Sequence, residues 1–117
     1  MEKAEIQALI REAFAAQKFA YVPYSHFHVG AALRGKNGQV FRGCNIENAS
    51  YTPTNCAERT ALFKAVSEGV REFDAIAIVG SKAGEKNTLV TGPCGVCRQA
   101  LYEFGGPGLT VIMAKSE

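Results

Sequence analysis

The chain has 117 residues, and thirteen Lys and Arg against eleven Asp and Glu give a formal net charge of only +2 at pH 7. This length fits a single domain, residues 1–117, with a core that needs no disulfides. The charges are scattered along the sequence, which argues against nucleic acid or an anionic membrane as a partner. No apolar run approaches the ~20 residues that span a bilayer, and the first residues do not resemble a signal peptide. We therefore expect a cytoplasmic protein.

A helix is predicted from residue 3 to about residue 18. Apolar side chains recur there at helical spacing, at Ile6, Leu9, Ile10, Ala13 and Phe14. Residues 20–25 are predicted to form a loop, because Pro23 favours extended geometry in the residue before it.

Two strands are predicted next, over residues 27–33 and 40–44. The pair Asn37-Gly38 between them is a strong signal for a tight turn, so the two strands should be antiparallel. After a loop over residues 45–55, a second helix is indicated by the spacing of Ala61, Leu62 and Ala65, and it should end near Gly69.

The remaining elements are a strand, a helix and a strand. The continuous apolar run over residues 74–79 suits a central strand that is covered on both faces. A third helix is predicted over about residues 95–104, followed by a last strand over residues 109–113. This order is typical of an α/β fold, a three-layer α/β/α sandwich with a mixed β-sheet between helices.

Three cysteines carry the chemistry. Cys56 belongs to the triplet Cys-Ala-Glu, and Cys94 and Cys97 follow about 35 residues later in Pro-Cys-Gly-Val-Cys. Three thiolates can hold one Zn²⁺ and leave a fourth position open, while the carboxylate of Glu58 can work on water bound there. Both clusters open a predicted helix, where the positive helix end favours the thiolate form. The sequence therefore predicts a hydrolytic zinc site.

The neighbours of Cys56 each have a structural alternative. Arg59 can donate to a ligand sulfur and offset the negative charge of three thiolates, or it can be a solvated helix residue. Glu58 can belong to a capping box that begins at Asn55, but beside the cysteines we favour a catalytic role. His26 and His28 are interpreted as ordinary residues at the start of the first strand.

Cys44 supports a competing hypothesis. As a fourth ligand it would close the site, and the protein would be a non-catalytic binding or scaffold module with structural zinc. A half-buried thiol at a strand end is the commoner finding, and Cys44→Ala separates the two cases by whether zinc is lost. A redox Cys-x-x-Cys leaves Cys56 and Glu58 unexplained, and disulfides are disfavoured without an export signal.

The motifs resemble those of the small tetrameric, zinc-dependent cytidine deaminases, and the resemblance covers nearly the whole chain. Cysteine as the first ligand fits that branch better than the polynucleotide editors and tRNA adenosine deaminases. The matching segments are Tyr21-Val22-Pro23-Tyr24-Ser25, Phe27-His28-Val29-Gly30-Ala31-Ala32-Leu33, Gly43-Cys44-Asn45-Ile46-Glu47-Asn48-Ala49-Ser50-Tyr51, Cys56-Ala57-Glu58-Arg59-Thr60-Ala61 and Pro93-Cys94-Gly95-Val96-Cys97-Arg98-Gln99.

The resemblance implies one Zn²⁺ per subunit on Cys56, Cys94 and Cys97, with Glu58 as the proton shuttle that converts cytidine or deoxycytidine to uridine or deoxyuridine and ammonia. Arg59 and Gln99 would support the ligands. It also implies a homotetramer with shared active sites. The implied nucleoside contacts are Phe27 on the pyrimidine, Asn45 and Glu47 on the ribose, and Ala49 and Tyr51 reaching a neighbouring subunit's site. The backbone N–H of Ala57 could bind the base carbonyl, because a small residue at a helix start permits close approach. Without the resemblance, Phe27 would be interpreted as a core residue, Asn45 and Glu47 as polar loop residues, and Tyr51 as interface packing.

The sequence departs from this family at its C-terminus. Members of the branch usually continue past the last predicted strand with another strand and a terminal helical segment, so this chain would have a shortened C-terminal strand and helix. A wider, wetter pocket would then bind cytidine more weakly and tolerate bulkier groups on N4 or on a modified base.

Overall fold

The computed structural model describes residues 2–49, 55–82, 99–100, 102–103 and 108–114. Each long element begins close to where the apolar pattern predicts it. The helices are α1 (Lys3–Gln17) and α2 (Ala57–Ser67), and the strands are β1 (Phe27–Gly35), β2 (Val40–Cys44), β3 (Phe73–Lys82) and β4 (Thr110–Met113). None of the described helices is long and apolar enough to cross a membrane.

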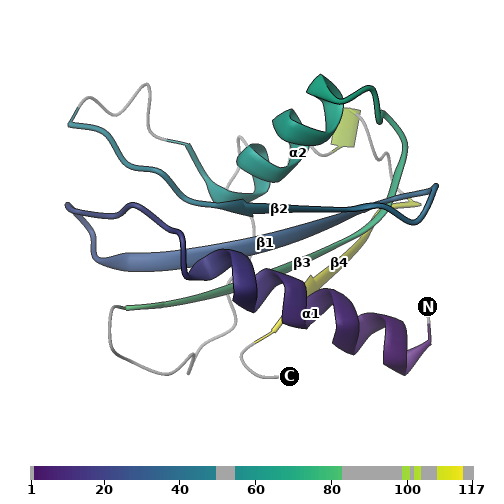
Figure 1. The fold of residues 1–117 in the computed structure, drawn as a ribbon, viewed down its shortest axis with the longest axis horizontal. Helices are drawn as coiled ribbons and strands as arrows, with labels where there is room; N and C mark the ends of the chain where they lie inside the picture. The colour runs from purple at the N-terminus through teal and green to yellow at the C-terminus, as the bar shows by residue number, and fades with distance from the viewer. Residues whose placement is uncertain (1, 50–54, 83–98, 101, 104–107, 115–117) are drawn as a thin grey trace.

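The strands form one mixed sheet in the order β2-β1-β3-β4 (Figure 1). β1 pairs antiparallel with both β2 and β3, while β4 runs parallel to β3. The hairpin between β1 and β2 turns at Gly38, whose φ of +90° is readily adopted only by glycine. The predicted antiparallel hairpin and the mixed sheet are both confirmed.

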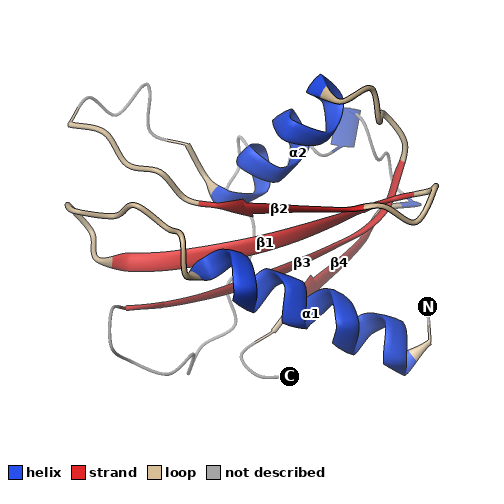
Figure 2. Cartoon of the chain, viewed as in Figure 1, coloured by secondary structure: helices blue, strands red, loops and turns tan. Residues whose placement is uncertain are grey.

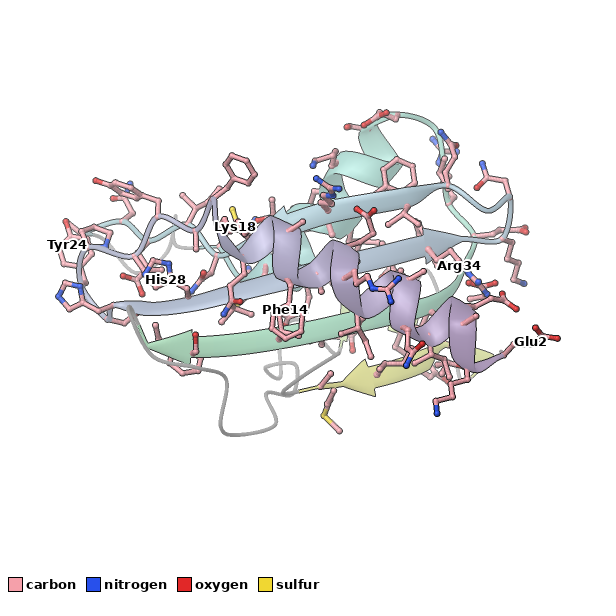
Figure 3. All side chains as sticks on the ribbon, turned by 60° about the horizontal axis from the view of Figure 1, so that its bottom comes forward. Glu2, Phe14, Lys18, Tyr24, His28 and Arg34 are labelled. Atoms are coloured by element: carbon pink, nitrogen blue, oxygen red, sulfur yellow. The ribbon has the colours of Figure 1, made fainter. Side chains whose placement is uncertain are left out.

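The helices cover opposite faces of this sheet (Figure 2). On one face, α1 packs its apolar stripe onto β1, β3 and the end of β4, with Leu9, Ile10 and Ala13 buried against Ala77 and Val79. Phe14 extends from α1 over the sheet (Figure 3). The sheet is therefore the middle layer of an α/β/α arrangement, as predicted.

On the other face, α2 packs against β1, β2 and β3. Ala61, Leu62 and Ala65 are fully buried there together with Leu33 and Ile76. Ala100, in the short helical stretch that the structure describes at residues 99–100, adds to the same cluster. This face carries the start of α2, where Cys56 and Glu58 lie.

An ion-pair network joins β1, β3 and α1 at the end of the sheet where β1 ends. Arg34 donates from Nε and Nη2 to the two carboxylate oxygens of Asp74, at 2.9 and 2.8 Å, and from Nη1 to Glu5 on α1 at 2.7 Å. Hydrogen bonding to Arg34 lowers the pKa of Asp74. Figure 3 shows Arg34 at the opposite end of the sheet from Tyr24 and His28.

Two glycines allow both helices to approach the sheet closely. A Cβ on Gly30 would lie 2.0 Å from the carbonyl oxygen of Ala13 in α1. A Cβ on Gly43 would lie 2.3 Å from the carbonyl oxygen of Ala57 and 2.5 Å from the nitrogen of Ala61 in α2. The atoms that would be struck are backbone atoms, so a side chain at either position requires the helix to move.

Gly43→Ala is therefore expected to destabilise the fold by about 1–3 kcal/mol, the usual effect of overpacking a tight contact. It should also displace the start of α2. Urea unfolding of the variant and the native chain measures the difference. Gly108→Ala is the matched control, because a Cβ there meets nothing within 4 Å. Equal destabilisation by the two substitutions would contradict the close approach of α2.

Several boundaries differ from the predictions. β1 runs two residues past the predicted strand, because Arg34 and Gly35 still pair with β3. β3 runs past its apolar run, because Gly80, Ser81 and Lys82 pair with the first residues of β1. The placement of His26 in the first strand is wrong. His26 precedes β1 and has a φ of +59°. α2 does end as predicted, with Gly69 at a φ of +92°.

Candidate active site

Cys56 lies at the N-cap of α2. Its backbone is extended, with φ −77° and ψ 155°, so the chain enters the helix directly from this residue. The backbone N–H and the hydroxyl of Thr60 both donate to the Cys56 carbonyl, at 3.0 and 3.2 Å. The sulfur consequently sits at the positive end of the helix, where the thiolate is favoured over the thiol.

Arg59 lies beside that sulfur. Its Nη2 donates to Cys56 Sγ at a distance of 3.6 Å, and both side chains are partly buried. A guanidinium in this place adds positive charge next to the thiolate and fixes its orientation. This is the contact that the sequence analysis expected of Arg59.

Glu58 is buried in the first turn of α2, with 4% of its surface exposed, and no other charged side chain in the described part of the chain is buried. Burying a carboxylate costs free energy, so such a residue is commonly a functional one. The alternative capping box at Asn55 is wrong. Cys56 is the N-cap, and the Asn55 amide instead donates to Thr60 Oγ1 at 3.1 Å.

Three short segments meet beside the start of α2. Ile46 and Asn55 exchange backbone hydrogen bonds of 2.9 and 2.8 Å. The Tyr21 N–H donates to the Asn45 carbonyl at 3.0 Å, and the Glu47 N–H donates to the Tyr21 carbonyl at 2.8 Å. Residues 20–26 and 45–49 therefore lie side by side at the end of the sheet where β1 begins (Figure 1). Asn55 joins this pairing and directly precedes Cys56.

Asn45 extends the contact between this loop and β1. Its Nδ2 donates to the Phe27 carbonyl at 2.8 Å, and its Oδ1 accepts from the Val29 N–H at 2.9 Å. Val29 packs against the core under α2, and Phe27 lies two residues before it on the same strand. Side chains two apart on a strand share a face, so half-buried Phe27 lies on the face that carries α2.

Glu47 holds the loop before β1. One carboxylate oxygen accepts from the backbone N–H groups of Tyr24 and Ser25, at 3.1 and 3.0 Å, and the other accepts from the Ser25 hydroxyl. Hydrogen bonds from the Ser25 side chain, followed by the backbone N–H groups, hold the pKa of Glu47 below its usual value. Glu47 is therefore an anion next to Phe27 and Asn45.

Other predicted residues are less constrained by the structure. Ala57 is fully buried at the first position of α2, while Ala49 and Gln99 are exposed. Cys94, Cys97 and Tyr51 lie outside the described residues. Within the described ranges no three His, Cys, Asp or Glu side chains gather as a metal site, and Cys56 is the one predicted ligand in those ranges.

Residues 3–114 match the sequence profile of a protein family described as the cytidine and deoxycytidylate deaminase zinc-binding region. The chain belongs to this deaminase family. Among its relatives, the cytidine deaminase of Sporosarcina psychrophila is 50% identical over 109 residues, 93% of this chain and 76% of that protein. The cytidine deaminase of Halalkalibacterium halodurans is 61% identical over 98 residues, 84% of this chain and 70% of that protein.

A solved structure supports the same assignment. The crystal structure of cytidine deaminase from Burkholderia pseudomallei matches 97% of this chain and 85% of its own, with a TM-score of 0.84 and 51% identity. This chain therefore has the α/β fold of the cytidine and deoxycytidylate deaminase family.

The described residues suit the zinc that the deaminase family binds. Cys56 offers a soft sulfur ligand at a helix N-terminus, and Arg59 supplies the compensating charge.

Cys44 lies on a different face of the sheet from the proposed zinc site. It pairs with Gly30, which faces α1, so its side chain lies on the face of the sheet opposite α2. Burial raises the pKa of the Cys44 thiol, although nearby Lys64 opposes this.

Cys44 instead lines a cavity of about 230 Å³ at the edge of the sheet. Ala16 and Phe19 of the α1 end and Thr60 and Lys64 of α2 also line it. The face of the sheet on which Cys44 lies argues against it as a fourth zinc ligand in this deaminase.

Sequence reasoning did not find two polar residues of the site, Ser25 and Thr60. Ser25 binds Glu47, which is 22 residues away, so no local pattern reveals the contact. Thr60 bonds to Cys56 four residues earlier, and a Thr one turn after a helix start is a signal that could have been recognised.

Proposed function

We propose that this chain hydrolyses cytidine and deoxycytidine to uridine and deoxyuridine with release of ammonia. The observation that carries the proposal is the buried carboxylate of Glu58 two residues after Cys56, at a helix start where Arg59 contacts the Cys56 sulfur. Membership of the deaminase family and relatives named cytidine deaminase at 50% and 61% identity support the substrate.

Cys56, Cys94 and Cys97 would hold one zinc ion per subunit. Zinc in such a site supplies a Lewis acid that makes water nucleophilic near neutral pH. Three thiolates leave an excess of negative charge, and the Arg59 guanidinium on Cys56 offsets part of it. Gln99 would support the ligands from the helical stretch that follows Cys97.

Glu58 moves the protons. It accepts a proton from the attacking water and donates it to N3 of the pyrimidine, which makes C4 more electrophilic. The hydroxide from that water adds to C4, and Glu58 then carries the proton of the new C4 hydroxyl to the exocyclic nitrogen. The C4–N bond breaks, ammonia leaves and the C4 carbonyl forms. This is the role of the glutamate in zinc deaminases generally, and its burial here keeps bulk water from competing for the proton.

Phe27, Asn45 and Glu47 would bind the nucleoside. Phe27 offers a half-buried ring on the α2 face, suited to stacking on a pyrimidine. After its bonds to β1, the Asn45 amide keeps one N–H hydrogen, and Glu47 keeps acceptor capacity beyond its three bonds. Both can bind ribose hydroxyls, and the buried N–H of Ala57 would bind the base carbonyl.

We further propose a homotetramer with shared active sites. Tyr21, Tyr24 and Ile46 expose 60%, 61% and 43% of their surfaces on the loops that hold the site. Exposed apolar side chains at this density suit burial by a second copy. Ala49, on the same loop, and Tyr51 would then reach a neighbour's site. Thiolate ligands need a reducing compartment, which favours the cytoplasm.

The direct test is turnover by the zinc-loaded chain. Loss of the cytidine ultraviolet absorbance should be matched mole for mole by ammonia release, with deoxycytidine as the second substrate. Light scattering on the same preparation should give four subunit masses. No ammonia from either nucleoside would reject the proposed activity, and a monomeric mass in a fully active preparation would reject the shared sites.

A further inference from the structure

The hydroxyl of Ser25 connects two residues that the proposed function places on different parts of the substrate. Ser25 Oγ donates its hydrogen to Glu47 and accepts the backbone N–H of Phe27 at 3.1 Å. The same hydroxyl thus donates to Glu47, which would bind the ribose, and accepts from Phe27, which would stack on the base.

The backbone of Phe27 is held from both sides. Its N–H bonds to Ser25, and its carbonyl accepts from the Asn45 amide at 2.8 Å. Glu47 binds the preceding turn as well, through the N–H groups of Tyr24 and Ser25. Both proposed ribose-binding residues therefore also determine where β1 begins.

His26, between Ser25 and Phe27, has a backbone conformation that requires these hydrogen bonds. His26 has a φ of +59°, in the left-handed region that a residue with a Cβ seldom occupies. Such a conformation persists only where the surrounding contacts fix it. Here the contacts are the His26 N–H to the Val22 carbonyl at 3.0 Å and the hydrogen bonds on either side of it.

We propose that Ser25 is a positioning residue for nucleoside binding. Through its hydroxyl, the Glu47 carboxylate that binds the ribose also sets the orientation of Phe27 against the pyrimidine. This inference rests on the proposed function, because that function places Glu47 and Phe27 on the nucleoside. It adds that ribose and base are recognised by one coupled network.

Ser25→Ala should raise KM for cytidine about tenfold and leave kcat within about twofold, since the loss affects binding and not the reacting C4. Ser25→Thr retains a hydroxyl on the same carbon and should restore the native KM. The exposed Ser67, whose hydroxyl donates to the Lys64 carbonyl at 2.7 Å, provides Ser67→Ala as the matched control with native kinetics.

The KM of a double variant measures whether Ser25 acts through Glu47. In a Glu47→Gln background, Ser25→Ala should raise KM by less than about twofold, because residues of one network are not additive. Amide hydrogen exchange gives a readout that needs no turnover: Ser25→Ala should speed exchange at Phe27, and Ser25→Thr should not.

Each outcome is decisive. A native chain that turns over cytidine while Ser25→Ala keeps the native KM, or a full tenfold effect that persists without Glu47, overturns the role of Ser25 and leaves the proposed function intact. A native chain without deaminase activity overturns the proposed function, and the role of Ser25 with it. A threonine variant as impaired as the alanine variant shows that the hydroxyl is not the cause.

Discussion

Glu58→Gln is expected to lower kcat for cytidine by about a thousandfold, within the range that general acid–base catalysis supplies. Glutamine has the size and shape of glutamate and can still form hydrogen bonds in the buried site. It cannot take a proton from water or deliver one to the base. The variant should therefore fold, bind one zinc per subunit and bind cytidine, yet fail in the chemical step.

The matched control for this variant is Glu68→Gln, the same substitution on an exposed glutamate at the other end of α2. Initial rates are followed by ultraviolet absorbance and ammonia release, with zinc measured by elemental analysis on the same samples. The control should keep the native kcat. A Glu58→Gln protein that is zinc-loaded and as active as the control would refute the role given to Glu58.

The sequence predicted the elements whose signals are local. The stripe on α1, the Asn37-Gly38 turn and the end of α2 at Gly69 each depend on residues close together in the chain. The position of Cys56 at a helix start was predictable for the same reason, since the apolar pattern of α2 begins just after it. Glu58 followed from that position and its spacing from Cys56.

Contacts between distant segments were not predictable in the same way. The extra length of β3 comes from residues 80–82, which carry no apolar run and pair with residues 27–29 of β1. The bond from Ser25 to Glu47 likewise joins two loops, and His26, the residue after Ser25, has a left-handed backbone. Such details follow from the tertiary structure and leave no periodic signal.

The glycines explain how these distant parts form one site. Gly43 on β2 lets the start of α2 lie close to the sheet, two residues before Asn45 turns toward β1. The end of β2, the start of α2 and the start of β1 are thereby brought to one end of the sheet. The proposed site combines a helix terminus, an aromatic ring and two polar side chains, and it is assembled from three short segments of the chain.

Cys56→Ser is expected to reduce bound zinc to less than about a tenth of one ion per subunit and to abolish deamination in proportion, because a neutral hydroxyl is a poor replacement for a thiolate ligand. Serine is a favourable N-cap, and the Cys56 side chain makes no capping hydrogen bond to the helix. The substitution therefore preserves or strengthens the start of α2. Far-ultraviolet circular dichroism should show native helix content in the zinc-poor protein.

Cys44→Ser makes the same atomic change on the other face of the sheet and decides between an open and a closed zinc site. Cys44 lines the cavity at the β2 edge, on the face of the sheet opposite α2, so we expect full zinc content and a kcat within about twofold of native. Loss of zinc from both variants would mean four cysteine ligands and a structural ion. Loss from Cys56→Ser alone leaves a coordination position for water beside Glu58, which hydrolysis requires.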